Sequence, residues 1–182
     1  MARAKREWFP GARYHIICRG NHRNDLFKDE KDYQVYLNIL KYVKKKLGYD
    51  LYCYCFMTNH VHMLIGTEEI HIGKVMKMIN MIYSIYFNKR YNLIGHLFQD
   101  RYKSRLIKDD VHLLEVSRYI HLNPVKANMV KNPEDYKWSS YRSIIGLSEE
   151  KIINSEKILF YFEDRENYKE FVVWGLTPLQ KM

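Results

Sequence analysis

The sequence predicts an α+β domain with a ferredoxin-like antiparallel sheet and helices packed on it. Two observations predict this class. Short β-rich segments alternate with segments of helical periodicity, and no repeat, low-complexity tract or linker divides the 182 residues. We expect residues 1–146 to form the main domain and residues 147–182 to form a short helical appendage.

Each predicted element has a local signal in the sequence. Strand segments are rich in β-branched and aromatic residues, whereas the helical segments space apolar side chains three and four apart, as in Tyr33, Tyr36 and Leu37. Gly48 ends the first helix, and Pro124 disfavours helical geometry at the residue before it. The predicted elements, in order, are a strand 12–19, a helix 29–47, strands 49–57 and 60–65, a helix 72–91, an extended segment 97–107, a helix 111–123 capped by Asp109 or Asp110, and one or two short helices within 155–175.

The composition indicates a basic globular protein of a reducing compartment. Hydrophobic residues make up 47% and charged residues 28%, and 30 Lys and Arg against 21 Asp and Glu give a net charge of +9. No stretch approaches the roughly 20 apolar residues of a membrane span, and the basic residues at Arg3, Lys5 and Arg6 precede no apolar segment of a signal peptide. Three cysteines cannot all pair within one chain. We therefore expect a cytoplasmic protein with no membrane partner.

The basic charge and its placement favour a nucleic-acid partner. Arg101, Lys103 and Arg105 would share one face of a strand, at intervals of about 7 Å that match successive phosphates. The alternative is an ordinary solvated face, which surplus charge alone does not exclude. Further contacts to the DNA backbone are expected just after the first strand, at Arg19, Asn21 and Arg23.

The residues that could carry chemistry are two histidines and a tyrosine. His60 and His62 are two apart on a strand, so both imidazoles project to one side and could bind one divalent metal. Tyr119 and Asn123 are four apart on a helix, so a hydroxyl could lie beside a metal that the amide oxygen helps to bind. Such a metal would act as a Lewis acid on a phosphate, with the tyrosine as nucleophile. Core packing of each residue is the plainer alternative.

Several ordered motifs make the chain resemble the REP-associated tyrosine transposases, within the single-tyrosine HUH (IS200-like) superfamily. The resemblance covers about residues 8 to 146, and its motifs are specific in order and spacing. The motifs are 10–15 (PGARYH), 18–23 (CRGNHR), 54–62 (YCFMTNHVH), 95–103 (GHLFQDRYK), 117–127 (SRYIHLNPVKA) and 136–141 (YKWSSY).

This resemblance implies a site and a reaction. It implies that His60 and His62 on a sheet strand are metal ligands for Mg²⁺ or Mn²⁺, that Asn123 is the third ligand, and that Tyr119 on a C-terminal helix is the nucleophile. It further implies cleavage of single-stranded DNA at palindromic hairpins, leaving a 5′-phosphotyrosine and a free 3′-hydroxyl. Both a monomer and a homodimer, with the active site in cis or in trans, agree with the sequence. Thr58 stands where the family motif has proline, a loop change away from the chemistry.

Other interpretations remain open from the sequence. Cys53 and Cys55, with the two histidines, could form a tetrahedral zinc site, although the spacing is unlike that of known fingers. A non-catalytic nucleic-acid-binding module on the same fold is a second alternative, and a replication initiator or relaxase is a third. His121 points away from Tyr119 on its helix, so we expect it to contact DNA or to pack rather than to bind metal.

Overall fold

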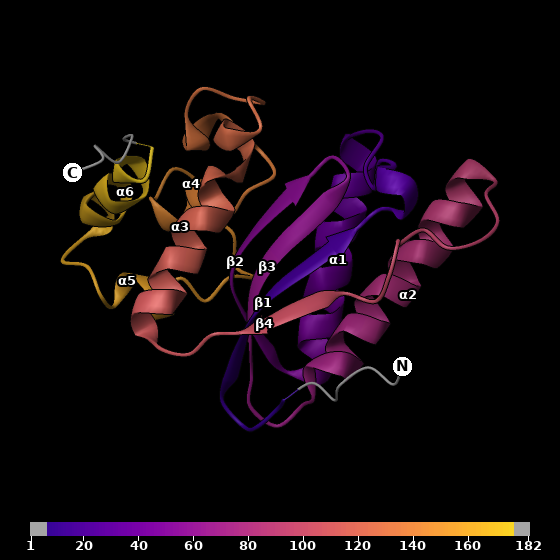
Figure 1. Ribbon diagram of the computed structural model, residues 1–182, viewed down its shortest axis with the longest axis horizontal. Helices are drawn as coiled ribbons and strands as arrows, with labels where there is room; N and C mark the ends of the chain where they lie inside the picture. Colours follow the sequence, from indigo (N-terminus) through magenta and orange to yellow (C-terminus); the bar gives the residue numbers. More distant parts are fainter. Residues whose placement is uncertain (1–6, 177–182) are drawn as a thin grey trace.

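A computed structural model describes residues 7–176 and shows a four-stranded antiparallel sheet in the order β2-β3-β1-β4. The sheet runs through the middle of the molecule, with helices on both faces (Figure 1). The α+β prediction is thereby confirmed. The strands are β1 (Ala12–Arg19), β2 (Tyr49–Met57), β3 (His60–Thr67) and β4 (Lys103–Leu106).

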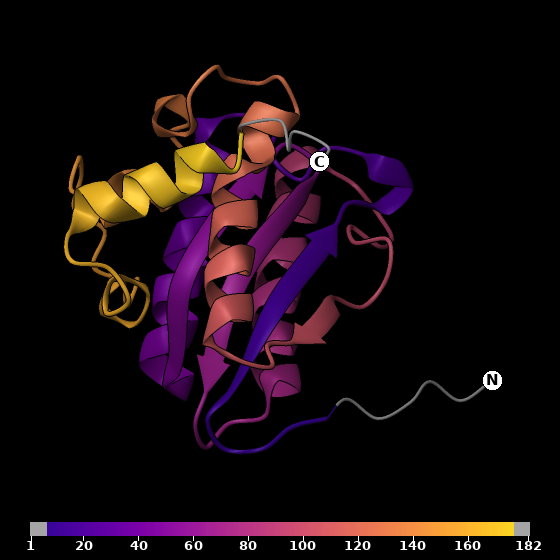
Figure 2. The same ribbon diagram turned by 60° about the vertical axis from the view of Figure 1, so that its left-hand side comes forward.

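The helices separate into two groups, one on each face of the sheet. The first group, α1 and α2, covers one face, and α3 lies across the other face with α6 crossing its outer side (Figures 1 and 2). None of the helices described is long and apolar enough to cross a bilayer. The helices are α1 (Glu30–Leu47), α2 (Ile72–Tyr91), α3 (Asp110–Lys126), α4 (Tyr141–Ile144), α5 (Glu156–Leu159) and α6 (Arg165–Trp174), with 3₁₀ turns η1 (Asn21–Arg23) and η2 (Pro133–Asp135).

Strand alternation explains why the sheet carries two hydrophobic cores. Successive side chains point to opposite faces, so Ile16 and Met63 join the core under α1 and α2, while Cys55 and Leu64 join the core under α3. All four are fully buried. Each fully buried side chain of this size contributes roughly 1.5–3 kcal/mol, and the central strands are stabilised from both sides.

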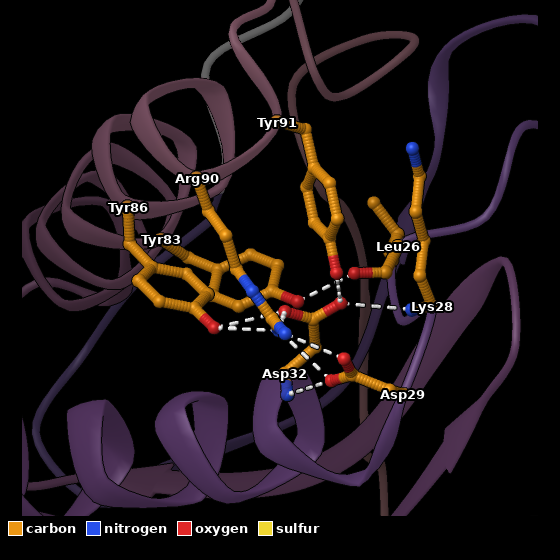
Figure 3. Close-up of polar contacts among 8 residues, drawn as sticks. All are labelled: Leu26, Lys28, Asp29, Asp32, Tyr83, Tyr86, Arg90 and Tyr91. Atoms are coloured by element: carbon orange, nitrogen blue, oxygen red, sulfur yellow. Dashed lines mark hydrogen bonds and ion pairs between the residues drawn. The ribbon is translucent and has the colours of Figure 1, made fainter.

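A buried carboxylate ties α1 to α2 on the first face (Figure 3). Asp32 in α1 has no exposed surface, and it pairs with Arg90 of α2. Asp29 caps the start of α1 and pairs with the same arginine. The donors to Asp32 are the backbone N–H of Lys28 (2.8 Å), the hydroxyls of Tyr86 (2.9 Å) and Tyr91 (2.8 Å), and the guanidinium of Arg90. An ionised carboxylate accepts only, so this donor set compensates its burial.

Three element boundaries differ from the sequence expectation, and the smallest difference is in β3, which continues to Thr67, two residues past its predicted end. The helix α3 starts at the cap Asp109, as expected, but continues through Pro124 to Lys126. Pro124 is buried, so its packing offsets the one backbone hydrogen bond that proline cannot donate. The extended segment 97–107 forms a regular strand only at β4, because its earlier part bridges to the loop after β1 through Phe98.

The two edges of the sheet differ in how their backbone groups are protected from pairing with another strand. On the outer edge of β2, later parts of the chain complete the backbone pairing: Phe56 N–H donates to Trp138 O at 2.9 Å and Asn154 N–H donates to Leu51 O at 2.7 Å. On the opposite edge, β4 is short and its outward residues are charged. The segment from η2 to α6 therefore contacts both β2 and α3; residues 177–182 of the predicted appendage lie outside the described part of the chain.

Candidate active site

Antiparallel pairing of β1 with β3 gathers three histidines on the face that α3 covers. In this register Ile17 lies opposite His62 and Arg19 opposite His60, so His15 points to the same face one step further along β1. The ring centroids of His60 and His62 are 5.0 Å apart, and those of His15 and His62 are 5.2 Å apart. The predicted pair of imidazoles is therefore brought together, with a third that the prediction did not include.

Hydrogen bonds orient the two predicted ligands in the same way. The Nδ1 of His60 lies 2.7 Å from Asn59 Oδ1, and this oxygen can only accept, so Nδ1 carries the proton. The Nδ1 of His62 lies 2.9 Å from His15 Nε2. With His62 as the donor in this bond, His60 and His62 both keep Nε2 as the unprotonated nitrogen. Metal-binding histidines are commonly oriented in this way by a partner on the other nitrogen.

Burial keeps these imidazoles neutral. Desolvation, followed by the charge of Arg19, lowers the pKa of His60 to about 4. Desolvation, followed by the neighbouring His15 and His60, lowers the pKa of His62 to about 2. Burial likewise lowers the pKa of His15 to about 4. At neutral pH the three rings are uncharged, which is the state that metal binding by His60 and His62 would require.

The tyrosine of α3 lies directly over this histidine cluster. The ring centroid of Tyr119 is 5.5 Å from that of His62 and 5.7 Å from that of His15, both in edge-on contact. Tyr119 is 42% exposed, so this residue lies at the surface of the molecule. The ammonium of Lys126, two turns later in α3, lies 5.6 Å from the Tyr119 ring centroid.

Asn123, the third ligand that the resemblance implies, lies one helical turn after Tyr119. Its side-chain N–H donates to the backbone oxygen of Tyr119 at 2.7 Å, which leaves the amide oxygen as a free acceptor. Two neutral imidazoles and an amide oxygen form a donor set suited to a divalent cation with open positions for phosphate oxygens. The residues present therefore fit the metal that the sequence implies.

The zinc alternative does not agree with the geometry. Within residues 7–176, no three or more His, Cys, Asp or Glu side chains are grouped so that they could bind a metal ion. Cys53 and Cys55 are fully buried, and burial raises the pKa of both thiols. Buried thiols of this kind pack as small apolar groups rather than as thiolate ligands.

Exposed cations continue from the histidine cluster toward the edge of the sheet. Arg105 lies opposite His15 and Lys103 lies opposite Ile17, so both cations belong to the face that carries the site. Arg101 is exposed as well, but it precedes β4 and is not part of the regular strand. The predicted common strand face of the three cations is therefore confirmed for Lys103 and Arg105 but not for Arg101.

The loop with Asn21 and Arg23 is bonded to the turn before β3. Gly20 N–H donates to Asn59 O at 2.9 Å, and the Asn59 amide donates to Arg23 O at 3.2 Å. A side chain at Gly20 would clash, because a Cβ there would lie 2.0 Å from Asn24 O. The close approach that only glycine permits thus brings the exposed Arg23 near the histidine cluster.

His121 was expected either to contact DNA or to pack, and the structure excludes the DNA contact. Its side chain is fully buried, and its two ring nitrogens lie 2.8 Å from Tyr168 Oη and 3.1 Å from Ser140 Oγ. Burial lowers its pKa to about 3, so the ring is neutral. Packing, the other option, describes this residue. Arg3, Lys5 and Arg6 of the basic N-terminus lie outside the described residues.

His15 is the site residue that the sequence reasoning missed. The signal was present, because His15 and Arg19 occupy the polar positions of a strand whose alternate residues Tyr14, Ile16 and Cys18 are buried. A histidine on the opposite face from such a row points to the face that carries the site. Only the strand register shows that this face is the one with His60 and His62.

Comparison with known proteins supplies the family. A model of the family described as IS200-like transposases matches residues 9–123, whereas no curated protein matches the sequence. A solved REP-associated tyrosine transposase bound to a REP hairpin is 17% identical, with a TM-score of 0.68 over 85% of this chain and 98% of that chain, and so shares the fold. A protein from Deinococcus radiodurans R1, proposed to be a transposase, is 18% identical, with a TM-score of 0.46 over 65% of this chain and 95% of that one. Because the family model spans more than half of its length, the chain belongs to the IS200-like transposase family.

Proposed function

We propose that this transposase cleaves and rejoins single-stranded DNA, with Tyr119 as the nucleophile and a divalent metal bound by His60, His62 and Asn123. The observation that carries the proposal is the edge-on contact of Tyr119 with His62, at 5.5 Å between ring centroids, beside two histidines whose Nδ1 atoms are already engaged. A phenol beside two neutral imidazoles, with an amide oxygen one helical turn away, supplies the parts that phosphoryl transfer to tyrosine requires.

The cleavage step is an in-line displacement at phosphorus. The phenol proton passes to solvent, the Tyr119 oxygen forms a bond to phosphorus, and the bond from phosphorus to the 3′ oxygen breaks. The departing oxygen takes a proton from water and becomes a free 3′-hydroxyl, and the 5′ end remains on the enzyme as a phosphotyrosine. Attack by a 3′-hydroxyl reverses these steps and rejoins a strand without an external energy source.

Residues of the chain supply positioning and charge for this step. Mg²⁺ or Mn²⁺, when bound, would withdraw electron density from the scissile phosphate. The ammonium of Lys126 beside the Tyr119 ring adds positive charge near the phosphate that the tyrosine would attack. His15 supports His62 by its hydrogen bond, and the Asn59 side chain supports His60. Arg105 and Lys103 extend the site with positive charge for the phosphates that follow.

Single-stranded DNA with hairpin structure is the substrate we propose. The solved relative of the same fold is bound to a REP hairpin, and the exposed cations Arg19, Lys103 and Arg105 lie on the face of the sheet that carries Tyr119. The nucleophile and the histidines come from one chain, so we propose that a monomer has a complete site in cis and that a dimer is not required for cleavage.

Formation of a covalent adduct tests the function. Purified protein is incubated with end-labelled single-stranded hairpins from the DNA flanking its gene, with Mn²⁺, with Mg²⁺ or with EDTA, and resolved on a denaturing gel. We expect a metal-dependent protein–DNA band with the wild type and none with Tyr119→Phe. Tyr42→Phe is the matched control, because Tyr42 is similarly exposed, at 53%, on the other face of the sheet.

A non-catalytic nucleic-acid-binding module is the competing function. It predicts salt-sensitive binding of the hairpins with no covalent band at any metal concentration, and equal behaviour of wild type and Tyr119→Phe. A band that survives Tyr119→Phe would instead assign the nucleophile to another residue and contradict the proposal.

A further inference from the structure

The C-terminal helix α6 contacts the helix that carries the nucleophile on both sides of Tyr119. One residue before it, the Arg118 guanidinium lies over the rings of Phe171 and Trp174, at 4.6 and 5.3 Å from their centroids. Two residues after it, His121 reaches the hydroxyl of Tyr168 at 2.8 Å. The family match ends at residue 123, so these partners in α6 lie beyond the part that defines the family.

The contact through His121 is a continuous buried chain of hydrogen bonds. Tyr168 Oη donates to Ser117 Oγ at 3.2 Å, and Ser117 Oγ donates to the backbone oxygen of Leu114 at 2.8 Å. Tyr168 has one proton, so it must accept from His121 Nδ1. The other ring nitrogen, Nε2, lies 3.1 Å from Ser140 Oγ, which joins this chain to the backbone of β2 at Tyr54. Tyr168, His121 and Ser117 have no exposed surface.

These hydrogen bonds fix the rotation of α3 about its own axis, which the apolar contacts of the helix leave adjustable. Ile120 and Leu113 pack α3 on the sheet, but apolar packing is non-directional and tolerates small rotations of a helix about its axis. Hydrogen bonds are directional, and here they join two successive turns of α3, at Ser117 and His121, to a single hydroxyl of α6. Rotation of α3 would stretch both bonds and would move Tyr119, which lies between them in the sequence.

We propose that His121 and Tyr168 are positioning residues, through which α6 sets the rotation of α3 and aims Tyr119 at His62. The proposal rests on the proposed function, because it assigns a catalytic consequence to the orientation of Tyr119. Neither residue touches the reacting atoms. A displacement of a reacting group by about 1 Å can slow a reaction about 100-fold, so a small rotation of α3 is sufficient.

The variant Tyr168→Phe tests the proposal, because it removes one hydroxyl and keeps the ring. The matched control is Tyr49→Phe: Tyr49 is equally buried, but its hydroxyl donates to Leu40 O, at 3.0 Å, in the core on the other face of the sheet. We expect both variants to lower the melting temperature by a similar amount. Only Tyr168→Phe should slow single-turnover adduct formation, by at least about 10-fold, with the dissociation constant for uncut hairpin unchanged within twofold.

Equal cleavage rates for the two variants would overturn the proposal, as would a slowing that is explained by weaker hairpin binding. If Tyr168→Phe does not fold, Ser117→Ala removes the acceptor of the Tyr168 hydroxyl, together with the Ser117 bond to Leu114 O within α3, and keeps a good helix former. A slowing of adduct formation by a few fold is expected for it, and an unchanged rate contradicts the proposal.

A second measurement separates this proposal from the function itself. With 3-fluorotyrosine at position 119, the ¹⁹F shift reports the ring environment set by His15 and His62, whether or not DNA is cleaved. We expect Tyr168→Phe to shift or broaden this signal and Tyr49→Phe to leave it unchanged. If the wild type forms no adduct, the proposed function fails, but this comparison still decides the positioning. A signal that neither variant changes would overturn it.

Discussion

The two faces of the sheet are held together by different chemistry. Between α1 and α2, a fully buried carboxylate at Asp32 accepts from a guanidinium, two phenols and a backbone N–H (Figure 3). Between α3 and α6, a neutral imidazole at His121 links a phenol and two serines. The first arrangement contains charged side chains, whereas the second contains only neutral hydrogen-bonding groups.

This difference separates stability from chemistry within one small domain. A buried ion pair that is broken leaves an uncompensated charge, so the α1–α2 face is costly to perturb but carries no residue of the site. The α3–α6 face carries Tyr119, and its neutral hydrogen bonds are individually worth only about 1 kcal/mol. We therefore expect mutations on the first face to change unfolding and mutations on the second face to change catalysis.

The largest expected effect is the loss of chemistry on removing a histidine of the site. His60→Ala should reduce metal-dependent adduct formation by about 1000-fold or more, equivalent to about 4 kcal/mol of transition-state stabilisation. Its side chain is only partly buried, so the melting temperature should change little. The measurement is single-turnover cleavage over a range of Mn²⁺ concentrations. Cleavage at the wild-type rate would show that His60 is not a ligand.

The opposite pattern is expected for Asp32→Ala on the other face. Its four donors lose their acceptor, so the free energy of unfolding should fall by about 3 kcal/mol. Urea denaturation measures this value, and cleavage per folded molecule is measured at a temperature where the variant is still native. A cleavage rate that falls as far as in His60→Ala would contradict the claim that the α1–α2 face affects stability and not catalysis.

Mild acid should loosen the two faces at different pH. The pKa of His121 is lowered to about 3 and that of His15 to about 4, so between those values and 6.5 the unfolded chain binds more protons than the folded one. The stability that these neutral rings contribute is therefore complete above pH 6.5 and is lost as the pH falls below it. On the other face, Arg90 lowers the pKa of Asp29 below 3.8, so its contribution is lost only in stronger acid.

Amide hydrogen exchange, corrected for intrinsic rates, checks this order. At pH 5, peptides from α3 and α6 should lose protection relative to pH 7.5, while peptides from α1 and α2 should retain theirs. Equal loss of protection in all four helices would mean that the faces open together.

The smallest effect is expected from the cations beside the site. Lys103→Ala and Arg105→Ala should each weaken hairpin binding without changing the cleavage rate of bound DNA, and each should reduce the slope of log K against log salt by about 1. Lys45→Ala is the control, because Lys45 is an exposed cation of α1 on the opposite face. A similar slope for all three variants would remove the assignment of the β4 edge to DNA.

The local elements could be predicted from the sequence because their signals are local. The bounds of β1, β2 and α2 agree with the predicted segments, and Asp29 and Gly48 limit α1 as expected. Periodicity, caps and glycines act within a few residues, so a single sequence contains them.

The parts that could not be predicted depend on contacts between distant residues. His15 joins the site only through the register of β1 with β3, and Tyr168 joins His121 across 47 positions of the chain. No local pattern encodes such a pairing. The continuation of α3 past Pro124 has the same origin, since burial of the proline ring decides it. The pairing of Tyr119 with His60 and His62 was one interpretation of the residue spacing, beside core packing, and the family resemblance implied it.

The two protected edges of the sheet also bear on self-association. An exposed β-strand edge is a template for pairing with another copy of the same chain, and aggregation often starts there. Here Trp138 and Asn154 bond to backbone groups on the outer edge of β2, and β4 has only four residues, two of them the exposed Lys103 and Arg105. Shortening the chain before residue 154 would uncover part of the β2 edge. Such a truncated protein should precipitate during expression, although every residue of the candidate active site would still be present.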